Sequence, residues 1–278
     1  MKSENVISFA DFANQYNGFI SEYGYSLFPD PSEFMEYLSD GNGKIIVIGS
    51  RPGQGKTSLM LSLIKDTPHI PVLIFSLELS AFQLINRFMC IAGEIKLSPS
   101  LVQIKEHELL TDNNLMNTNR HVFICDIRKI TFEKFHSIIT FQQSENPVKL
   151  VFIDYYQLLD EATPELLFKI KKCAELFNLT IVVLSQLERN IDTNPMKTPT
   201  IASFPRLNEI DNIDEAYYLF RPDRYGIIRV DNGYCLENTG IVNCLKGKFK
   251  NNKILFKINN ENSAFVKADA MDVLMKME

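Results

Sequence analysis

Short runs of consecutive apolar residues recur along most of this chain, and stretches with a helical period lie between them. The runs predict strands at residues 44–48, 72–75, 121–125, 149–154 and 180–184. Between them, apolar residues recur every three or four positions, which predicts helices over 56–65, 80–89, 131–143 and 163–177. Strands that alternate with helices are typical of an α/β fold with a mostly parallel central sheet and flanking helices.

The last third of the chain has strand character without helices between the strands. Further strands are predicted at residues 215–220, 226–230, 240–245, 253–258 and 264–266. We expect these strands to form β-hairpins at the C-terminal end of the sheet. The basic segment 246–253 lies between two of them, where a solvated hairpin tip is one interpretation.

Residues 1–25 stand apart from the rest. Aromatic residues recur there at spacings of three and four, so a helix would align them on one face: Phe9, Phe12, Tyr16, Phe19 and Tyr23. This face can pack on its own domain or dock on a neighbouring subunit, and the sequence leaves both open. We therefore divide the chain into an N-terminal aromatic arm or helix, 1–25, and one α/β domain, 26–278.

A glycine-rich loop joins the first predicted strand to the helix that follows it. Its backbone N–H groups and the positive helix N-terminus favour an anion, Lys56 can reach the β and γ phosphates of a nucleotide, and Thr57 can ligate Mg²⁺. The predicted nucleotide-binding residues are Ser50, Arg51, Gly53, Gly55, Lys56, Thr57 and Ser58. Ser50 stands where the usual pattern has glycine, and the alternative is a turn that binds nothing.

Polar side chains also follow other predicted strands directly, at the edge where open α/β sheets place their ligands. Glu78 can polarise the water that attacks a γ-phosphate, or it can support a helix dipole. Asp154 can hold Mg²⁺ through water or through the Thr57 hydroxyl, whereas an isolated Asp there is usually a turn residue. Gln186 can sense the γ-phosphate, or it can bond a neighbouring loop.

Composition narrows these interpretations only slightly. The chain has 278 residues, 45% hydrophobic and 23% charged, as in ordinary globular proteins. The net charge of −5 gives no global basic excess for nucleic-acid binding, although a local basic channel remains compatible with it. The five cysteines are scattered without a zinc-site spacing. We expect a cytoplasmic protein, because neither a signal segment nor a membrane span is evident.

Four of these stretches together resemble the C-terminal motor domain of DnaB-type replicative helicases. They are Arg51-Pro52 before Gly55-Lys56-Thr57, residues 75–80 (Phe-Ser-Leu-Glu-Leu-Ser), residues 153–158 (Ile-Asp-Tyr-Tyr-Gln-Leu) and residues 184–189 (Leu-Ser-Gln-Leu-Glu-Arg). The resemblance spans roughly residues 31–267. It implies a RecA-like P-loop NTPase fold that binds ATP and Mg²⁺, with residues 26–278 as the ATPase domain.

The resemblance also implies roles for individual residues. Lys56 and Thr57 would bind phosphate and metal, Asp154 would hold Mg²⁺, and Glu78 would be the catalytic base. Gln186 would couple the γ-phosphate to loops that bind DNA near Arg189 and Arg206. Members of the family form hexameric rings with ATP between subunits, and a basic pair reaches the phosphates of the neighbour's nucleotide. In this chain Lys246 and Lys248 stand where that pair is expected.

The sequence departs from the family pattern in three places. Lys248 stands where the family usually has arginine, which can bind phosphate through two donors at once. The segment Arg206-Leu207-Asn208-Glu209 matches the family's DNA loop only loosely. The family's N-terminal collar domain has no counterpart in the sequence, so a separate protein partner could replace it.

We therefore expect an ATP-dependent, DnaB-like helicase or translocase motor that acts on single-stranded DNA as a homo-oligomer. The main alternative is a nucleotide-dependent interaction or regulatory ATPase, derived from the same motor, that does not unwind DNA. A small-molecule kinase would share the phosphate loop but would not explain the Ser-Gln-Leu-x-Arg segment at 185–189.

Overall fold

The structure is a computed structural model, and the residues it describes are 31–93, 121–159, 164–187, 199, 203–204, 212–227, 236–248 and 253–268. The aromatic segment 1–25 and the arginines at 189 and 206 lie outside these residues. The expectations placed on them therefore remain predictions.

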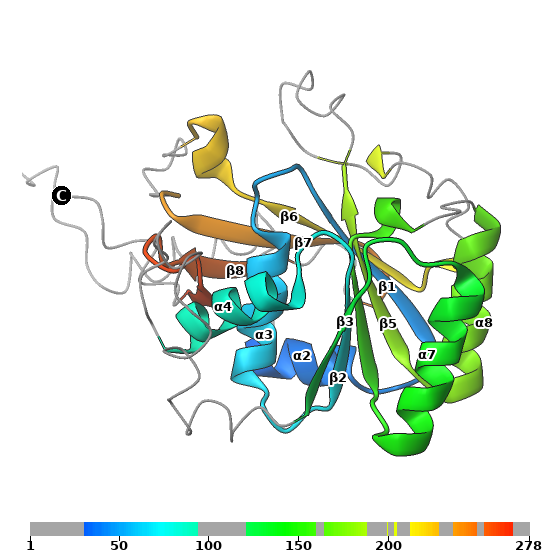
Figure 1. Ribbon diagram of the computed structural model, residues 1–278. Helices are drawn as coiled ribbons and strands as arrows, with labels where there is room; N and C mark the ends of the chain where they lie inside the picture. The colour runs from blue at the N-terminus through cyan, green and yellow to red at the C-terminus, as the bar shows by residue number, and fades with distance from the viewer. Residues whose placement is uncertain are drawn as a thin grey trace, which may run out of the picture.

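A nine-stranded sheet forms the centre of the molecule, in the order β3-β2-β4-β5-β1-β6-β7-β8-β9 (Figure 1). Its parallel part contains β3 (Val122–Asp126), β2 (Val72–Ser76), β4 (Leu150–Asp154), β5 (Thr180–Gln186), β1 (Lys44–Ser50) and β6 (Glu215–Phe220). Its antiparallel part continues through β7 (Thr239–Lys246), β8 (Lys253–Ile258) and β9 (Phe265–Lys267). The expected mostly parallel sheet with C-terminal hairpins is confirmed.

Helices cover both faces of this sheet (Figure 1). One face carries α2 (Pro31–Leu38), α3 (Lys56–Asp66) and α4 (Ala81–Ala92), and the other carries α7 (Phe132–Glu145) and α8 (Pro164–Phe177). Strand β1 lies between two hydrophobic cores because alternate side chains of a strand point to opposite faces. Ile46 and Ile48 therefore pack with α2 and α3, whereas Ile45 and Val47 pack with α7 and α8. A strand buried on both faces needs the continuous apolar run seen in the sequence.

The predicted helix starts are confirmed where the structure describes them. Ser80 caps α4, its hydroxyl accepting from the Gln83 N–H while the Gln83 side chain accepts from the Ser80 N–H. Thr131 caps α7 by accepting from the Lys134 N–H. The starts of α4 and α7 therefore follow from local hydrogen bonds that can be anticipated from the sequence.

The prediction of a strand at residues 226–230 is wrong at its first residue, Gly226. A short 3₁₀ helix, Pro222–Tyr225, follows β6, and Gly226 ends it with a φ of 72°. Proline favours the first turn of a helix, and glycine accepts the left-handed conformation that ends one. Residues 228–230 lie outside the described part of the chain.

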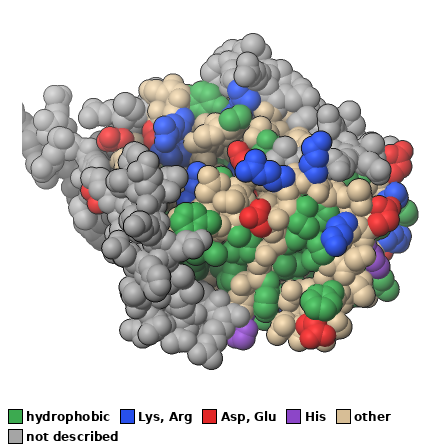
Figure 2. All heavy atoms as spheres, in the orientation of Figure 1, with side chains coloured by type: hydrophobic (Ala, Val, Ile, Leu, Met, Phe, Trp, Pro, Cys, Tyr) green, Lys and Arg blue, Asp and Glu red, His purple; other side chains and the backbone are tan. Residues whose placement is uncertain are grey.

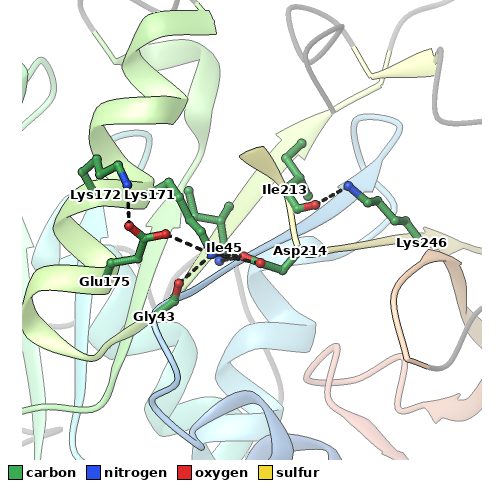
Figure 3. A network of polar contacts seen from close by, with 8 residues as sticks. All are labelled: Gly43, Ile45, Lys171, Lys172, Glu175, Ile213, Asp214 and Lys246. Atoms are coloured by element: carbon green, nitrogen blue, oxygen red, sulfur yellow. Dashed lines mark hydrogen bonds and ion pairs between the residues drawn. The ribbon is translucent and has the colours of Figure 1, made fainter. Parts of the chain in front are cut away.

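A polar network connects α8 with the amino-terminal ends of β1 and β6 (Figure 3). The Lys171 ammonium on α8 donates to both carboxylate oxygens of Asp214, at 2.9 and 2.7 Å, and to the Gly43 carbonyl at 2.8 Å. The same Asp214 carboxylate accepts from the Ile45 N–H at 2.7 Å. Asp214 thus connects α8, the start of β1 and the residue before β6.

We expect Asp214→Ala to lower the free energy of unfolding by about 1–3 kcal/mol, because it leaves the Lys171 ammonium and the Ile45 N–H without this acceptor. Urea denaturation would measure the change. The matched control is Lys172→Ala, in the same helix as Lys171. Lys172 pairs with Glu175 at 2.8 Å on an exposed surface, and such pairs contribute little to the free energy of unfolding. Equal changes in the two variants would contradict a structural role for Asp214.

Candidate active site

The sheet register brings the predicted site residues to one edge. Ser50 at the end of β1 pairs with Gln186 at the end of β5, and Ser76 at the end of β2 pairs with Asp154 at the end of β4. Helix α3, which carries the predicted phosphate ligands, starts directly after the loop that follows β1. The carboxyl ends of four neighbouring strands therefore meet around the N-terminus of α3, the usual ligand position in such sheets.

The loop between β1 and α3 is fixed on both sides. The Arg51 guanidinium donates to the Leu187 carbonyl beyond β5 at 3.0 Å. On the other side, the buried Gln54 side chain accepts from the Arg221 N–H beyond β6 at 2.7 Å. Gly55 precedes α3 with a φ of 95°, a conformation that side chains disfavour. The loop backbone is thus held in place on both sides, directly before the start of α3.

Lys56, the first residue of α3, is a buried cation. Its side chain is 8% exposed, and its ammonium donates to the Ser50 hydroxyl at 3.2 Å. Burial lowers the pKa of Lys56 to about 8, although the carboxylates of Asp154 and Glu78 act in the opposite direction. A phosphate at this position would compensate the buried charge, so the site favours an anion.

Thr57 and Asp154 form the second part of the site. The Thr57 hydroxyl donates to Asp154 Oδ2 at 2.7 Å, so the two side chains proposed to hold Mg²⁺ lie side by side. Asp154 is 2% exposed, and among the described residues its Oδ1 atom is buried without a hydrogen-bond partner. Burial raises the pKa of Asp154, and the Thr57 hydrogen bond and the Lys56 ammonium oppose the rise.

These two residues fit a Mg²⁺ ion. Mg²⁺ prefers oxygen ligands and is usually held by one or two protein groups together with substrate phosphates. The Asp154 carboxylate has an unpaired buried oxygen, and the Thr57 hydroxyl lies beside it. A cation here would satisfy the orphaned oxygen and offset the cost of burying the carboxylate.

Gln157 is a site residue to which the sequence analysis gave no role. It lies in the short 3₁₀ helix Tyr156–Leu158, and its amide donates to the Ser185 hydroxyl and to the Gln186 carbonyl, both at 2.9 Å. Its carbonyl oxygen accepts from the Gln186 N–H at 3.2 Å. Gln157 therefore fixes the end of β5 relative to β4, and its place within the motif 153–158 was the only sequence signal for it.

Gln186 is the last residue of β5, and its side chain lies close enough to Tyr155 to oppose the rise in the pKa of the Tyr155 hydroxyl. Burial, together with the carboxylates of Glu78 and Asp154, raises the pKa of the Tyr155 hydroxyl. The peptide bond between Asp154 and Tyr155 is cis. Gln186 therefore lies beside the residue that follows Asp154.

Glu78 lies just beyond β2 with its side chain exposed. Its charge acts on Lys56, Asp154 and Tyr155, which places it beside the phosphate site. The backbone around it is fixed, because the Leu77 N–H donates to the Asp154 carbonyl at 2.8 Å. Helix α4 is capped by Ser80 and has no acidic residue in its first turn, so the alternative of a dipole-supporting Glu78 is not favoured.

Lys246 and Lys248 lie at the opposite edge of the sheet. Lys246 ends β7 and pairs with Ala216, near the amino-terminal end of β6. Its ammonium donates to the Ile213 carbonyl at 2.5 Å (Figure 3). The Lys248 ammonium lies 5.5 Å from the centre of the Tyr37 ring. Within one chain the structure therefore keeps these lysines away from Lys56.

Charged side chains of both signs are visible on the face that Figure 2 shows. Basic side chains gather in the upper half of the view, the half that contains the loop between β1 and α3 in Figure 1, with acidic side chains among them. A local basic surface is therefore compatible with the negative net charge. In the part of the chain that the structure describes, no helix has the length and apolar character needed to cross a membrane.

Comparisons with known proteins agree with this geometry. The family model for the DnaB-like helicase C-terminal domain matches residues 36–259. A probable replicative DNA helicase from Guillardia theta is 30% identical over 216 residues, covering 70% of this chain and 36% of that protein. The replicative DNA helicase DnaB of Geobacillus stearothermophilus is 25% identical over 227 residues, covering 76% of this chain and 48% of that protein. The chain thus spans between about a third and a half of these relatives.

Solved structures show the same fold. One solved structure that consists of an ATPase domain superposes with a TM-score of 0.70 at 20% identity, covering 96% of this chain and 100% of that domain. A DnaB-like replicative helicase, studied for its interactions with primase, superposes with a TM-score of 0.69 at 20% identity. That comparison covers 97% of this chain and 69% of the other.

Proposed function

The chain belongs to the family of DnaB-like helicase C-terminal domains, the ATPase domain of those helicases, and from this premise we propose that it is a motor that hydrolyses ATP with Mg²⁺ and acts on single-stranded DNA. The observation that carries the proposal is the Thr57–Asp154 hydrogen bond beside the buried Lys56 ammonium. A triphosphate and its metal are the ligands that such a pair and such a cation fit.

The residues of the site divide the work between binding and proton transfer. Lys56 and the N–H groups at the start of α3 bind and orient the phosphates. Thr57 and Asp154 would hold Mg²⁺, which when bound neutralises charge on the β and γ phosphates. Glu78 accepts a proton from the attacking water, and Gln186 orients that water or senses the γ-phosphate. The exposed position of Glu78 next to the buried site supports this role.

We extend the proposal to a homo-oligomer, such as a hexameric ring, with ATP between subunits. Lys246 and Lys248 of one subunit would contact the phosphates bound by the next. Their position at the sheet edge opposite Lys56 supports action on a neighbour, since they cannot serve the nucleotide of their own chain. Arg189 and Arg206 remain the proposed DNA contacts, on the strength of the sequence.

The second candidate is a regulatory ATPase derived from the motor that does not unwind DNA. Lys248 favours it, because a lysine in place of the family's arginine binds phosphate as a point charge and lacks the paired donors of a guanidinium. Such a protein would use bound ATP to control assembly or the binding of a protein partner. It would still bind ATP at Lys56 and Asp154.

The ATPase rate with and without single-stranded DNA distinguishes these functions. For a motor on DNA we expect stimulation by single-stranded DNA that weakens as salt rises, because phosphate contacts are lost with increasing salt. Phosphate release would be measured at low and moderate ionic strength, with duplex DNA as the matched control. ATP binding without any response to DNA at either salt concentration would contradict the motor and favour the regulatory ATPase.

A further inference from the structure

A buried carboxyl group lies at the sheet edge opposite the nucleotide site. Glu215, the first residue of β6, is 4% exposed. One of its oxygens accepts a hydrogen bond from the Tyr37 hydroxyl on α2, and the other accepts from the Tyr217 hydroxyl. A carboxylate has acceptor sites only, so two hydroxyl donors match its two oxygens. The catalytic edge described above does not include this cluster.

Both hydroxyls are kept as donors by their surroundings. Burial raises the pKa of Tyr37 and of Tyr217, and the Glu215 carboxylate raises both further. The two tyrosines come from elements far apart in the chain, so the cluster fixes α2 to the start of β6. Such a buried, fully paired group holds its neighbours in one geometry.

The turn that carries the two lysines rests directly on this carboxyl group. Gly247 lies between Lys246 and Lys248 with a φ of 119°, in the region that favours glycine. A Cβ atom on Gly247 would lie 2.6 Å from the Glu215 Cγ atom, so only a glycine backbone can approach so closely. The position of the turn therefore depends on the position of the Glu215 side chain.

Two further contacts connect the same cluster to the lysines. The Tyr37 ring, whose hydroxyl is bonded to Glu215, has the Lys248 ammonium 5.5 Å from its centre. The pairing of β6 with β7 shifts between Ala216 and Tyr217, so that β7 bulges just before Lys246. Bulges of this kind re-aim the side chains that follow them.

We infer that Glu215, together with the hydroxyls of Tyr37 and Tyr217, is a positioning group for the 246–248 turn. It holds the turn in the geometry that lets Lys246 and Lys248 reach the nucleotide of the neighbouring subunit. The inference rests on the proposed action of these lysines between subunits. Glu215 does not touch the nucleotide. It acts through the backbone of Gly247 and the ring of Tyr37, and it would set how well one subunit activates the next.

The first test compares variants of the full chain. Glu215→Gln replaces one acceptor oxygen of the cluster by an amide NH₂, and Tyr37→Phe removes one donor hydroxyl. Because each change removes one buried hydrogen bond, we expect kcat for ATP to fall about tenfold with KM nearly unchanged. The matched control is Tyr218→Phe, on the same strand but in the other hydrophobic core, which should keep the wild-type kcat. Wild-type kcat in both Glu215→Gln and Tyr37→Phe would overturn the inference.

Mixed oligomers separate positioning from simple destabilisation. Lys56→Ala subunits have a defective nucleotide site and an intact 246–248 turn. Glu215→Gln subunits have an intact nucleotide site and a misplaced turn. In a mixed oligomer, the nucleotide site of a Glu215→Gln subunit can meet the intact turn of a Lys56→Ala neighbour. We expect turnover to be restored at these interfaces. The reference mixture combines Lys56→Ala with subunits in which Lys246 and Lys248 are both alanine.

The two mixtures distinguish failure of the inference from failure of the proposed function. Recovery in both mixtures supports the positioning role. Recovery only in the reference mixture overturns the role of Glu215 and leaves the action of the lysines between subunits intact. Absence of recovery in both mixtures rejects the action of the lysines between subunits, and the positioning role is rejected with it.

Discussion

Replacement of Lys56 by alanine is expected to abolish ATP turnover. The ammonium is buried, donates to the Ser50 hydroxyl and lies beside the Thr57–Asp154 pair, so it is the fixed positive charge of the phosphate site. Without it, the charge that develops on the transferred phosphoryl group loses its main protein donor. We expect the rate to fall by about 10²–10³-fold or more, since removal of a single preorganised donor costs about 10²–10³-fold.

Phosphate release at saturating ATP would measure this loss. The matched control is Lys65→Ala at the other end of α3, where the ammonium pairs with Asp66 at 3.2 Å and the phosphate loop is not contacted. That variant should keep the wild-type rate. Turnover that persists in Lys56→Ala would reject the assignment of the phosphate loop.

Glu78→Gln is expected to remove hydrolysis while ATP binding stays near the wild-type level. The glutamine keeps the shape of the side chain but cannot accept the proton of the attacking water. Because Glu78 is exposed, the fold should tolerate the change. Equilibrium binding of a fluorescent ATP analogue and steady-state turnover, measured on the same preparation, would separate the two properties.

A second exposed carboxyl group provides the control for this variant. Glu36 on α2 lies 3.7 Å from the His69 ring on an exposed surface, and Glu36→Gln should change neither property. If ATP binding is lost together with hydrolysis in Glu78→Gln, the role of Glu78 is structural and the base must be another group.

The strands and helices that surround the site could be predicted because their signals are local. A strand buried on both faces has to be apolar throughout, and β1, β2, β4 and β5 all carry such runs. Lys56, Thr57 and Asp154 could be singled out as candidate site residues for a related reason, since each stands directly after a predicted strand or loop. The Thr57–Asp154 hydrogen bond confirmed that these positions meet.

Features that depend on pairing between distant segments could not be predicted. Glu215 was only the first residue of an expected strand, and nothing local indicates that hydroxyls from Tyr37 and Tyr217 converge on it. The position of Lys246 likewise depends on the direction and register of β7, which apolar patterning alone does not give. The wrong strand prediction at Gly226 has a local cause. Pro222 and Gly226 favour a short 3₁₀ helix and its end, and this preference outweighed the short apolar run that follows.

Strand β6 connects two places that one subunit would present to different neighbours. Its carboxyl end leads into Arg221, whose N–H holds the phosphate loop through Gln54, and its amino end carries Glu215 beneath the lysine turn. The strand is hydrogen-bonded to β1 on one side and β7 on the other, so it cannot bend or shorten independently. The loop before α3 and the 246–248 turn are therefore anchored at the two ends of the same six-residue strand, which is held by hydrogen bonds on both sides.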